Sequence, residues 1–207
     1  GIDPQYYNKD KSAGAGVREK YGIDQKAIVV GFVGNLTERK GIEFFIDAAE
    51  KLALNNTNVV FLVVGGKLES PRYTEELAPL VQEKKLSKKM YFTGRVDDTV
   101  PYYSTMDIFC MTSLEEPFAR VNLEAMIMGL PVVATDAGGN SEQVVENETG
   151  HIVEKGDLEV YIDKVQLLID DDKRRTDMGI QGRERVLQNF TEETYVESIN
   201  NLLGPFA

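Results

Sequence analysis

Residues that build disulfides and transition-metal sites are almost absent from this sequence. Its 207 residues include one cysteine, one histidine and no tryptophan. A single cysteine, Cys110, cannot form an internal disulfide, and with His151 alone beside it the sequence cannot supply the usual ligands of a zinc site. We therefore expect no metal site, structural roles for both residues, and the reducing environment of the cytoplasm.

Basic residues are also in deficit. The sequence has 23 Lys and Arg against 34 Asp and Glu, a net charge of −11. A field of that sign repels phosphate backbones at long range, so we expect no nucleic-acid partner. The densest basic stretch, residues 84–89, is short, and we expect it to be the solvated end of a helix.

Long apolar runs are missing as well. No stretch approaches the roughly 18 apolar residues that span a bilayer, and no signal-peptide pattern opens the chain. The chain begins Gly1-Ile2-Asp3-Pro4, without an initiator methionine. We therefore expect it to be a piece of a longer protein.

The sequence does contain a regular alternation of short β-rich runs and helical patterns. The runs predict strands at 28–33, 59–64, 90–92, 108–111, 132–134 and 151–153. The patterns predict helices from 42, over 73–85, 99–106, 120–128 and 142–147, and then an apolar stripe from 158 to 169 followed by two more helices.

Repeated strand–helix units predict one Rossmann-like, doubly wound α/β domain, with a parallel sheet of about six strands and a C-terminal helical tail. In such a sheet, ligands bind where the carboxyl ends of the strands meet. The loops after residues 33, 64, 92, 111 and 134 are therefore where a site is expected.

The loop after the first predicted strand runs Gly34-Asn35-Leu36-Thr37-Glu38-Arg39-Lys40-Gly41. It is neither a G-x-G-x-x-G dinucleotide fingerprint nor a G-x-x-x-x-G-K-[ST] phosphate loop, which counts against a nicotinamide or flavin oxidoreductase. Arg39 and Lys40 nevertheless place cations beside a helix start, where a phosphate could bind.

The loop after the fourth predicted strand holds two carboxylates and a helix start. Pro117 predicts that a helix begins there, with Phe118, Ala119 and Arg120 in its first turn, so free amides and a positive dipole end would face a pyrophosphate. Glu116 before the helix and Glu124 in its second turn would instead accept hydrogen bonds from sugar and ribose hydroxyls. From the spacing alone, a helix cap and a solvated helix residue explain these two carboxylates better.

A resemblance to a known family favours the sugar-binding role of these two carboxylates over the structural one. Glu116 and Glu124 stand as E-x7-E, followed by Ala125-Met126-Ile127-Met128-Gly129-Leu130-Pro131-Val132-Val133-Ala134. This resembles the E-P-F-G-x-x-x-x-E-A-M-A-x-G-x-P-V-V-A signature of glycosyltransferase family 4, whose retaining enzymes have the two-domain GT-B fold. Residues 34–41 resemble the family's G-R-L-x-x-x-K-G loop, and residues 92–96 resemble its F-x-G-x-V segment. Residues 137–150 resemble its G-G-x-x-E and T-G stretch, and residues 1–3 resemble its interdomain hinge.

The resemblance implies that residues 1–207 are the nucleotide-sugar-binding C-terminal domain, that is, one half of a GT-B fold, with the N-terminal acceptor domain absent. Lys40 and Glu116 would be the catalytic residues, the first on the diphosphate and the second on the donor sugar. The donor would be bound by Gly34, Asn35, Arg39, Lys40, Arg95, Val96, Glu116, Phe118, Ala119, Arg120, Val121 and Glu124, with the base near Arg95 and Val96 and the ribose on Glu124.

Two positions depart from the family pattern. Asn35 replaces the usual arginine, so one diphosphate cation is missing unless Arg39 takes its place. Ala119 replaces the usual glycine, and its methyl group would narrow the space beside the sugar. Both bear on the choice of donor: a UDP-sugar is commonest in the family, and a GDP-sugar is the alternative.

Two other acidic segments are weak candidates for a metal or nucleotide site. We expect residues 170–172, three consecutive aspartates, to be a polar turn rather than a D-x-D metal site, and Asp97 to be a weak base or ribose candidate. No cofactor is expected, since Lys40, Arg39 and the helix start would stabilise the leaving diphosphate without a metal.

The resemblance thus implies retaining transfer of a hexose from a nucleoside diphosphate, with a sugar, lipid or glycan acceptor held by the missing domain. Any membrane contact, peripheral at the inner face, would also go through that domain. The alternatives are a nucleotide-sugar epimerase, a phosphorylase of the same fold, and a catalytically silent nucleotide-binding subunit.

Overall fold

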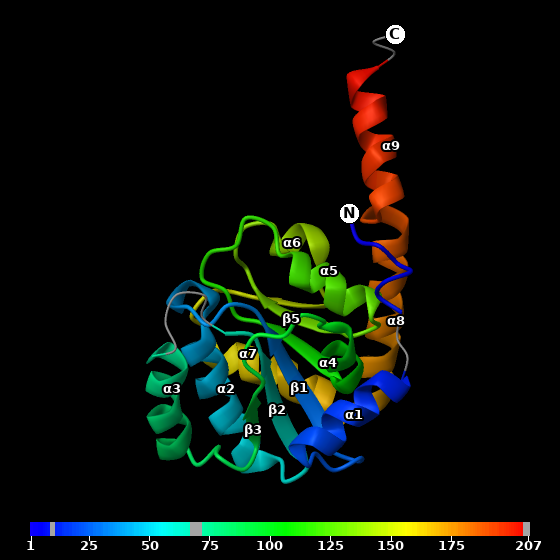
Figure 1. Cartoon of the computed structure of the whole chain (residues 1–207). Helices are drawn as coiled ribbons and strands as arrows, with labels where there is room; N and C mark the ends of the chain where they lie inside the picture. Colours follow the sequence, from blue (N-terminus) through cyan, green and yellow to red (C-terminus); the bar gives the residue numbers. More distant parts are fainter. Residues whose placement is uncertain (9–10, 67–71, 205–207) are drawn as a thin grey trace.

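A computed structural model describes residues 1–8, 11–66 and 72–204 (Figure 1). Over these residues, one parallel sheet of six strands forms in the order β3-β2-β1-β4-β5-β6. The strands are β1 (Ile28–Val33), β2 (Val59–Val64), β3 (Met90–Phe92), β4 (Ile108–Met111), β5 (Val132–Thr135) and β6 (Gly150–Val153). The predicted doubly wound fold and all six predicted strands are confirmed.

The strand order reverses between β1 and β4. From β1 the chain adds β2 and β3 on one side, and then crosses over to add β4, β5 and β6 on the other. β1 therefore lies in the middle, paired along its whole length with β2 and at Val30 and Gly31 with β4. The crevice beyond the carboxyl ends of β1 and β4 is the switch point at which this fold binds ligands.

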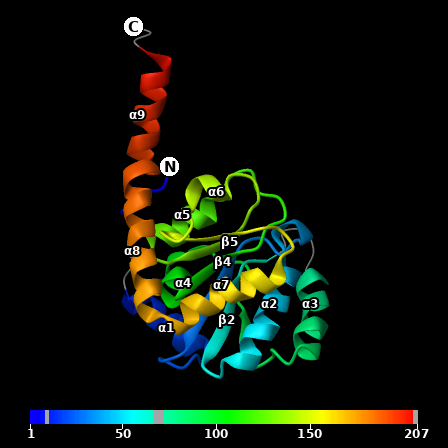
Figure 2. The ribbon, with the colours of Figure 1, turned by 180° about the vertical axis from the view of Figure 1, so that it is seen from behind.

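Helices cover both faces of the sheet (Figures 1 and 2). One face carries α2, α3 and α7, and the other carries α1, α4, α5 and α8. Before the tail, the helices are α1 (Lys11–Tyr21), α2 (Ile42–Asn55), α3 (Arg72–Glu83), α4 (Val100–Thr105), α5 (Arg120–Ile127) and α6 (Asn140–Gln143), with a 3-10 turn at Glu38–Lys40.

The structure differs from the local predictions in three places. First, α1 is a helix that was not predicted. The short helix expected at 142–147 lies earlier, as α6, because residues 144–149 instead form a bridge and turn that lead into β6. The basic stretch 84–89 follows the end of α3 and is not fully solvated: Leu86 is buried, and Lys84 forms ion pairs with Asp47 and Glu50 of α2.

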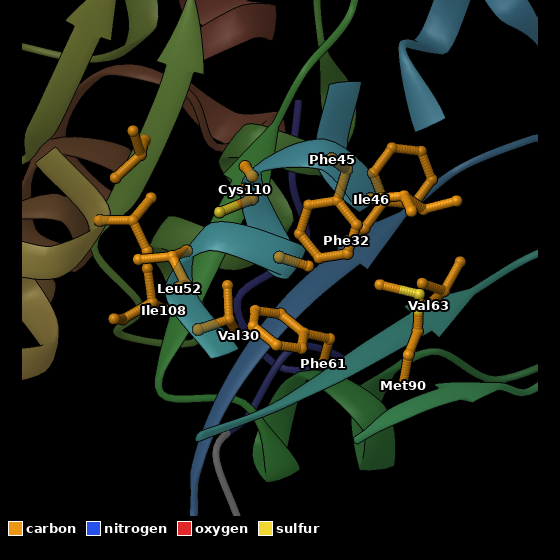
Figure 3. Packing of buried hydrophobic residues seen from close by; sticks show 14 of the residues in the cluster. Val30, Phe32, Phe45, Ile46, Leu52, Phe61, Val63, Met90, Ile108 and Cys110 are labelled. Atoms are coloured by element: carbon orange, nitrogen blue, oxygen red, sulfur yellow. The ribbon is translucent and has the colours of Figure 1, made fainter. Parts of the chain in front are cut away.

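The core is divided by the sheet into two apolar clusters. On the α2 side, Phe45 packs between Phe32 of β1 and Phe61 of β2, with ring centroids 5.6 Å and 6.1 Å apart (Figure 3). Cys110 lies in the same cluster, buried in β4 as its apolar neighbours predict. Alternating side chains of the same strands fill both clusters, which explains why the strands read as continuous apolar runs.

The tail is helical, as predicted, and consists of α7 (Leu158–Asp170), α8 (Asp172–Asn189) and α9 (Glu192–Leu203). Asp171 accepts a hydrogen bond from the Arg174 amide and caps α8. The aspartate run is therefore the junction of two helices rather than a separate turn, since Asp170 ends α7 and Asp172 begins α8. Helix α9 extends α8 away from the body beyond α6 (Figures 1 and 2). Within this fully described helix no side chain is buried.

The first residues of the chain pack against this C-terminal tail. Ile2 is fully buried and pairs with Thr191, at the junction of α8 and α9. Within the described ranges, no helix is long and apolar enough to cross a membrane.

Candidate functional site at the carboxyl edge of the sheet

Loops from β1, β2, β3 and β4 surround an open hollow of about 410 Å³ at the switch point. Its lining residues are Val33, Gly34, Asn35, Lys40, Val64, Gly65, Gly66, Arg95, Val96, Thr99 and Val121. The structure thus gathers the first-loop residues, the F-x-G-x-V segment and the start of α5 around one space. Gly65, Gly66 and Thr99 were not predicted, although the glycines directly follow β2.

Lys40 is held by the backbone around it. It ends the 3-10 turn, and Gly41 then turns the chain into α2 with a φ of 65°. A Cβ atom at Gly41 would lie 2.0 Å from the carbonyl oxygen of Thr112, so only glycine fits at this approach. The Thr112 hydroxyl donates to the carbonyls of Lys40 (3.1 Å) and Gly41 (2.9 Å). The first loop is thereby fixed to the end of β4.

Glu116 is fixed from the other side, by the loop after β5. Gly138 has a φ of 54°, and a Cβ atom there would lie 1.9 Å from the Glu116 carbonyl oxygen. The Gly139 amide donates to the carbonyls of Glu116 and Pro117, at 3.3 Å and 3.1 Å. A Cβ atom at Gly139 would lie 2.8 Å from the Pro117 carbonyl oxygen, so the close approach of the two loops explains both successive glycines after β5.

The two predicted catalytic side chains meet. The Lys40 ammonium donates to Oε2 of Glu116 in an ion pair, and the side chains are only 17% and 9% exposed. A pair so shielded from water is held by its mutual charge, since either partner alone would be costly to bury. The cation and the carboxylate thus neutralise each other.

The helix after Glu116 begins later than predicted. Ala119 is the N-cap and α5 starts at Arg120, so Pro117 and Phe118 belong to the loop rather than to the first turn. Among the described residues no side chain caps this end, which leaves helix amides and the positive dipole end open to an anion. The Ala119 side chain is buried in the core, while Phe118 is exposed and faces the Phe190 ring at 6.3 Å.

Glu124 lies on the buried side of α5. Its Oε2 accepts a hydrogen bond from the Tyr103 hydroxyl at 3.0 Å, and its Oε1 accepts from Nε of Arg120 at 3.2 Å. Tyr7 lies near as well: burial raises the pKa of its phenol, and the Glu124 charge raises it further. Neither tyrosine was predicted, because nothing in the sequence relates them to Glu124.

Other candidates lie at the rim. Arg39 is exposed and makes a long 3.4 Å contact with the Glu115 carbonyl, outside the lining of the hollow. Asp97 is exposed, whereas Asp98 accepts from the Val100 amide at the start of α4 and from the Tyr6 hydroxyl.

Two residues expected to be structural lie inside the fold. Burial raises the pKa of Cys110 to about 12. His151 is fully buried in β6, and burial lowers its pKa, although Glu146, 3.1 Å from its Nδ1, acts in the opposite direction. Within the described residues, no group of three or more His, Cys, Asp or Glu side chains is arranged to hold a metal ion.

A larger hollow, of about 790 Å³, lies at the opposite edge of the sheet, between α1 and α8. Its arginines are engaged by the fold. Arg18, Arg175 and Arg183 donate to the carbonyls of Thr105, Leu168 and Ile127, near the ends of α4, α7 and α5. These side chains satisfy helix carboxyl ends, which is a structural role.

Comparison with known proteins finds relatives of this chain among the glycosyltransferases. Residues 16–185 match the family model "Glycosyl transferases group 1". The capsular polysaccharide biosynthesis glycosyltransferase CapM of Staphylococcus aureus is 31% identical over 178 residues, which are 86% of this chain and 46% of CapM. The chain thus spans about half the length of such relatives.

Solved structures of glycosyltransferases also superpose on this chain. HepE of Anabaena, solved in complex with UDP and glucose, superposes with a TM-score of 0.90 at 27% identity, over 100% of this chain and 55% of HepE. The C-terminal domain of the group 1 glycosyltransferase LpcC of Francisella tularensis superposes with a TM-score of 0.82 at 28% identity, over 93% of this chain and 100% of that domain. The chain therefore belongs to the group 1 glycosyltransferases and has the fold of one half of a GT-B enzyme.

Proposed function

We propose that this chain is the nucleotide-sugar-binding domain of a retaining, metal-independent hexosyltransferase. The observation that carries the proposal is the meeting of Lys40 and Glu116 beside the uncapped start of α5, at the switch point of the sheet. A cation and open helix amides suit a diphosphate, and a neighbouring carboxylate suits sugar hydroxyls.

The diphosphate would lie between Lys40 and the start of α5. Lys40 gives one mobile positive charge, and the backbone from Phe118 to Val121 gives the dipole end of the helix. As the bond between sugar and diphosphate breaks, negative charge develops on the leaving oxygen next to this cation. Because Asn35 is uncharged and Arg39 lies outside the hollow, Lys40 would supply most of that stabilisation.

The nucleoside would occupy the rest of the hollow. Arg95 and Val96 line it on the β3 side and would contact the base. Glu124 would bind the ribose, while Glu116 and the loop around Phe118 and Ala119 would contact the transferred sugar. UDP is the favoured nucleotide, since HepE was solved with UDP, and GDP is the alternative.

Transfer itself would need the remainder of a longer protein. The acceptor (a sugar, a lipid or a glycan) would be held by an N-terminal domain that closes over the hollow. Any membrane contact would go through that domain, and the single buried cysteine fits a cytoplasmic location.

Titration calorimetry with UDP, UDP-glucose, GDP and GDP-mannose tests the binding function on this chain. We expect one of the two nucleotide families to bind, with the same affinity in EDTA as in Mg²⁺, and no transfer of sugar to an acceptor. Binding of neither family would refute the donor site, and turnover by these 207 residues alone would refute the need for a second domain. In the full-length enzyme, NMR of the first-formed product should show the anomeric configuration of the donor.

A further inference from the structure

The two carboxylate oxygens of Glu124 have different surroundings. Oε2 accepts from the Tyr103 hydroxyl in a buried hydrogen bond of 3.0 Å. Oε1 accepts from Arg120, whose side chain is 63% exposed, and such solvent-screened pairs are weak. One oxygen is thus held inside the protein, and the other has a partner that a ligand can replace.

Tyr103 is suited to hold that inner oxygen permanently. Its side chain is fully buried, and its ring packs against Phe109 of β4 at a centroid distance of 5.9 Å. Burial and then the charge of Glu124 raise the pKa of the phenol well above its ordinary value. The hydroxyl therefore remains protonated and remains a donor throughout the working range of pH.

Both residues stand one helical turn from the hollow. Glu124 follows the lining residue Val121 by three positions on α5, which puts the two on the same side of that helix. Tyr103 follows the lining residue Thr99 by four positions, and its amide donates to the Thr99 carbonyl at 3.0 Å. The hydrogen bond between Tyr103 and Glu124 thus joins α4 to α5, two helices that each begin at the hollow, at Thr99 and near Val121.

We propose that Tyr103 is a positioning residue for the nucleotide: its hydroxyl fixes Oε2 of Glu124 so that Oε1 is presented to the ribose. This role rests on the proposed function, in which Glu124 binds the ribose. Without the hydroxyl, Oε2 would lose its buried 3.0 Å donor, and Tyr7, the other buried phenol near Glu124, would be left to hold the carboxylate from inside, so that its orientation would no longer be fixed. The expected loss is therefore confined to recognition of the ribose hydroxyls.

The test is Tyr103→Phe, which keeps the ring and removes the donor. Calorimetry measures the affinity for UDP and for 2′,3′-dideoxy-UDP, or for the guanosine pair if the parent prefers GDP. We expect the ratio of the two affinities to fall about three- to ten-fold, the value of one hydrogen bond, because the natural nucleotide loses affinity and the dideoxy form does not. Tyr91→Phe is the matched control, since that hydroxyl makes an exposed 3.3 Å contact with the Lys88 carbonyl, and the ratio for this variant should equal that of the parent.

An equal loss for both nucleotides, or an unchanged ratio, would overturn the positioning role while leaving the donor site intact. Failure of the parent to bind either nucleotide would instead refute the proposed function itself. A double-mutant cycle gives a second measurement: in a Glu124→Gln background, Tyr103→Phe should no longer change the ratio. An undiminished effect in that background would show that Tyr103 acts through the fold and not through Glu124.

Discussion

The side chains of Lys40 and Glu116 form an ion pair that joins the loop after β1 to the loop before α5, across 76 positions of sequence. Under the proposed function, a diphosphate would exchange with Glu116 as a partner of the Lys40 ammonium. This exchange would release the carboxylate at the moment when sugar hydroxyls arrive to meet it. The proposed function would then couple binding of the nucleotide to release of the carboxylate through this one ion pair.

Lys40→Ala should weaken binding of UDP about ten- to a hundred-fold and leave binding of uridine nearly unchanged. The loss corresponds to a charge-assisted contact with phosphate, worth roughly 1.5–3 kcal/mol. Calorimetry with both ligands measures it. Arg39→Ala is the control, because this neighbouring cation is exposed at the rim and its removal should cost little. Equal UDP affinity in Lys40→Ala and the parent would show that Lys40 does not meet the diphosphate.

Glu116→Gln should separate sugar recognition from nucleotide recognition. The variant loses the partner of Lys40, so the ammonium is freer for phosphate and UDP affinity should be kept or should rise. The neutral amide accepts less strongly from sugar hydroxyls, so turnover in the full-length enzyme should fall more than donor affinity. Glu124→Gln should behave differently and weaken UDP and UDP-glucose alike. Matching profiles for the two variants would refute this division of roles.

Gly138→Ala should destabilise the protein more than Gly156→Ala does. Both positions have a positive φ, 54° and 87°, which costs roughly 1–3 kcal/mol for alanine. At Gly138 the added Cβ would also meet the Glu116 carbonyl oxygen at 1.9 Å, whereas at Gly156 it meets nothing within 4 Å. The difference between the two losses in free energy of unfolding, measured in urea, therefore reports the contact with the Glu116 carbonyl, because the backbone strain is common to both variants. Equal losses would mean that the loop after β5 yields easily.

Stability should fall as the pH is lowered from 7.5 to 5.5, in part through His151. Burial lowers the pKa of this imidazole in the folded protein, while in the unfolded chain it takes up a proton near pH 6.5. The unfolded state then binds more protons, and acidification favours it. Melting temperatures across this range should therefore drop more steeply in the parent than in His151→Gln. Parallel curves would show that His151 does not contribute.

The fold was largely predictable because its strands are buried on both faces. Runs such as Val59–Val64 are apolar throughout and stop at glycines, so local sequence suffices to locate them. Helix α1 gives a weaker signal: it contains Gly14 and Gly16, and no acidic residue lies in its first turn. Helix α6 ends at Gln143, and the residues after it form a tight local turn bridged between Glu146 and Gly150, which competes with a helix over 142–147.

The site was predictable only in part, for a similar reason. Loops that follow strands of a parallel sheet must gather at one edge, and this rule brings Lys40, Arg95 and Val121 together without knowledge of their contacts. The pairing of Lys40 with Glu116, and the bond from Tyr103 to Glu124, depend on side-chain directions across separate elements. These two contacts are therefore visible only in the three-dimensional structure.

The position of Cys110 makes the protein easy to label. This thiol is the only one in the chain, it lies in the middle of β4, and its raised pKa of about 12 leaves almost no thiolate at neutral pH. A cysteine introduced at Leu54, which is 76% exposed near the end of α2 away from the hollow, would be the single reactive point for a maleimide dye or a surface tether. The domain could then be immobilised with its hollow facing solution, and no native residue would have to be replaced to remove background reaction.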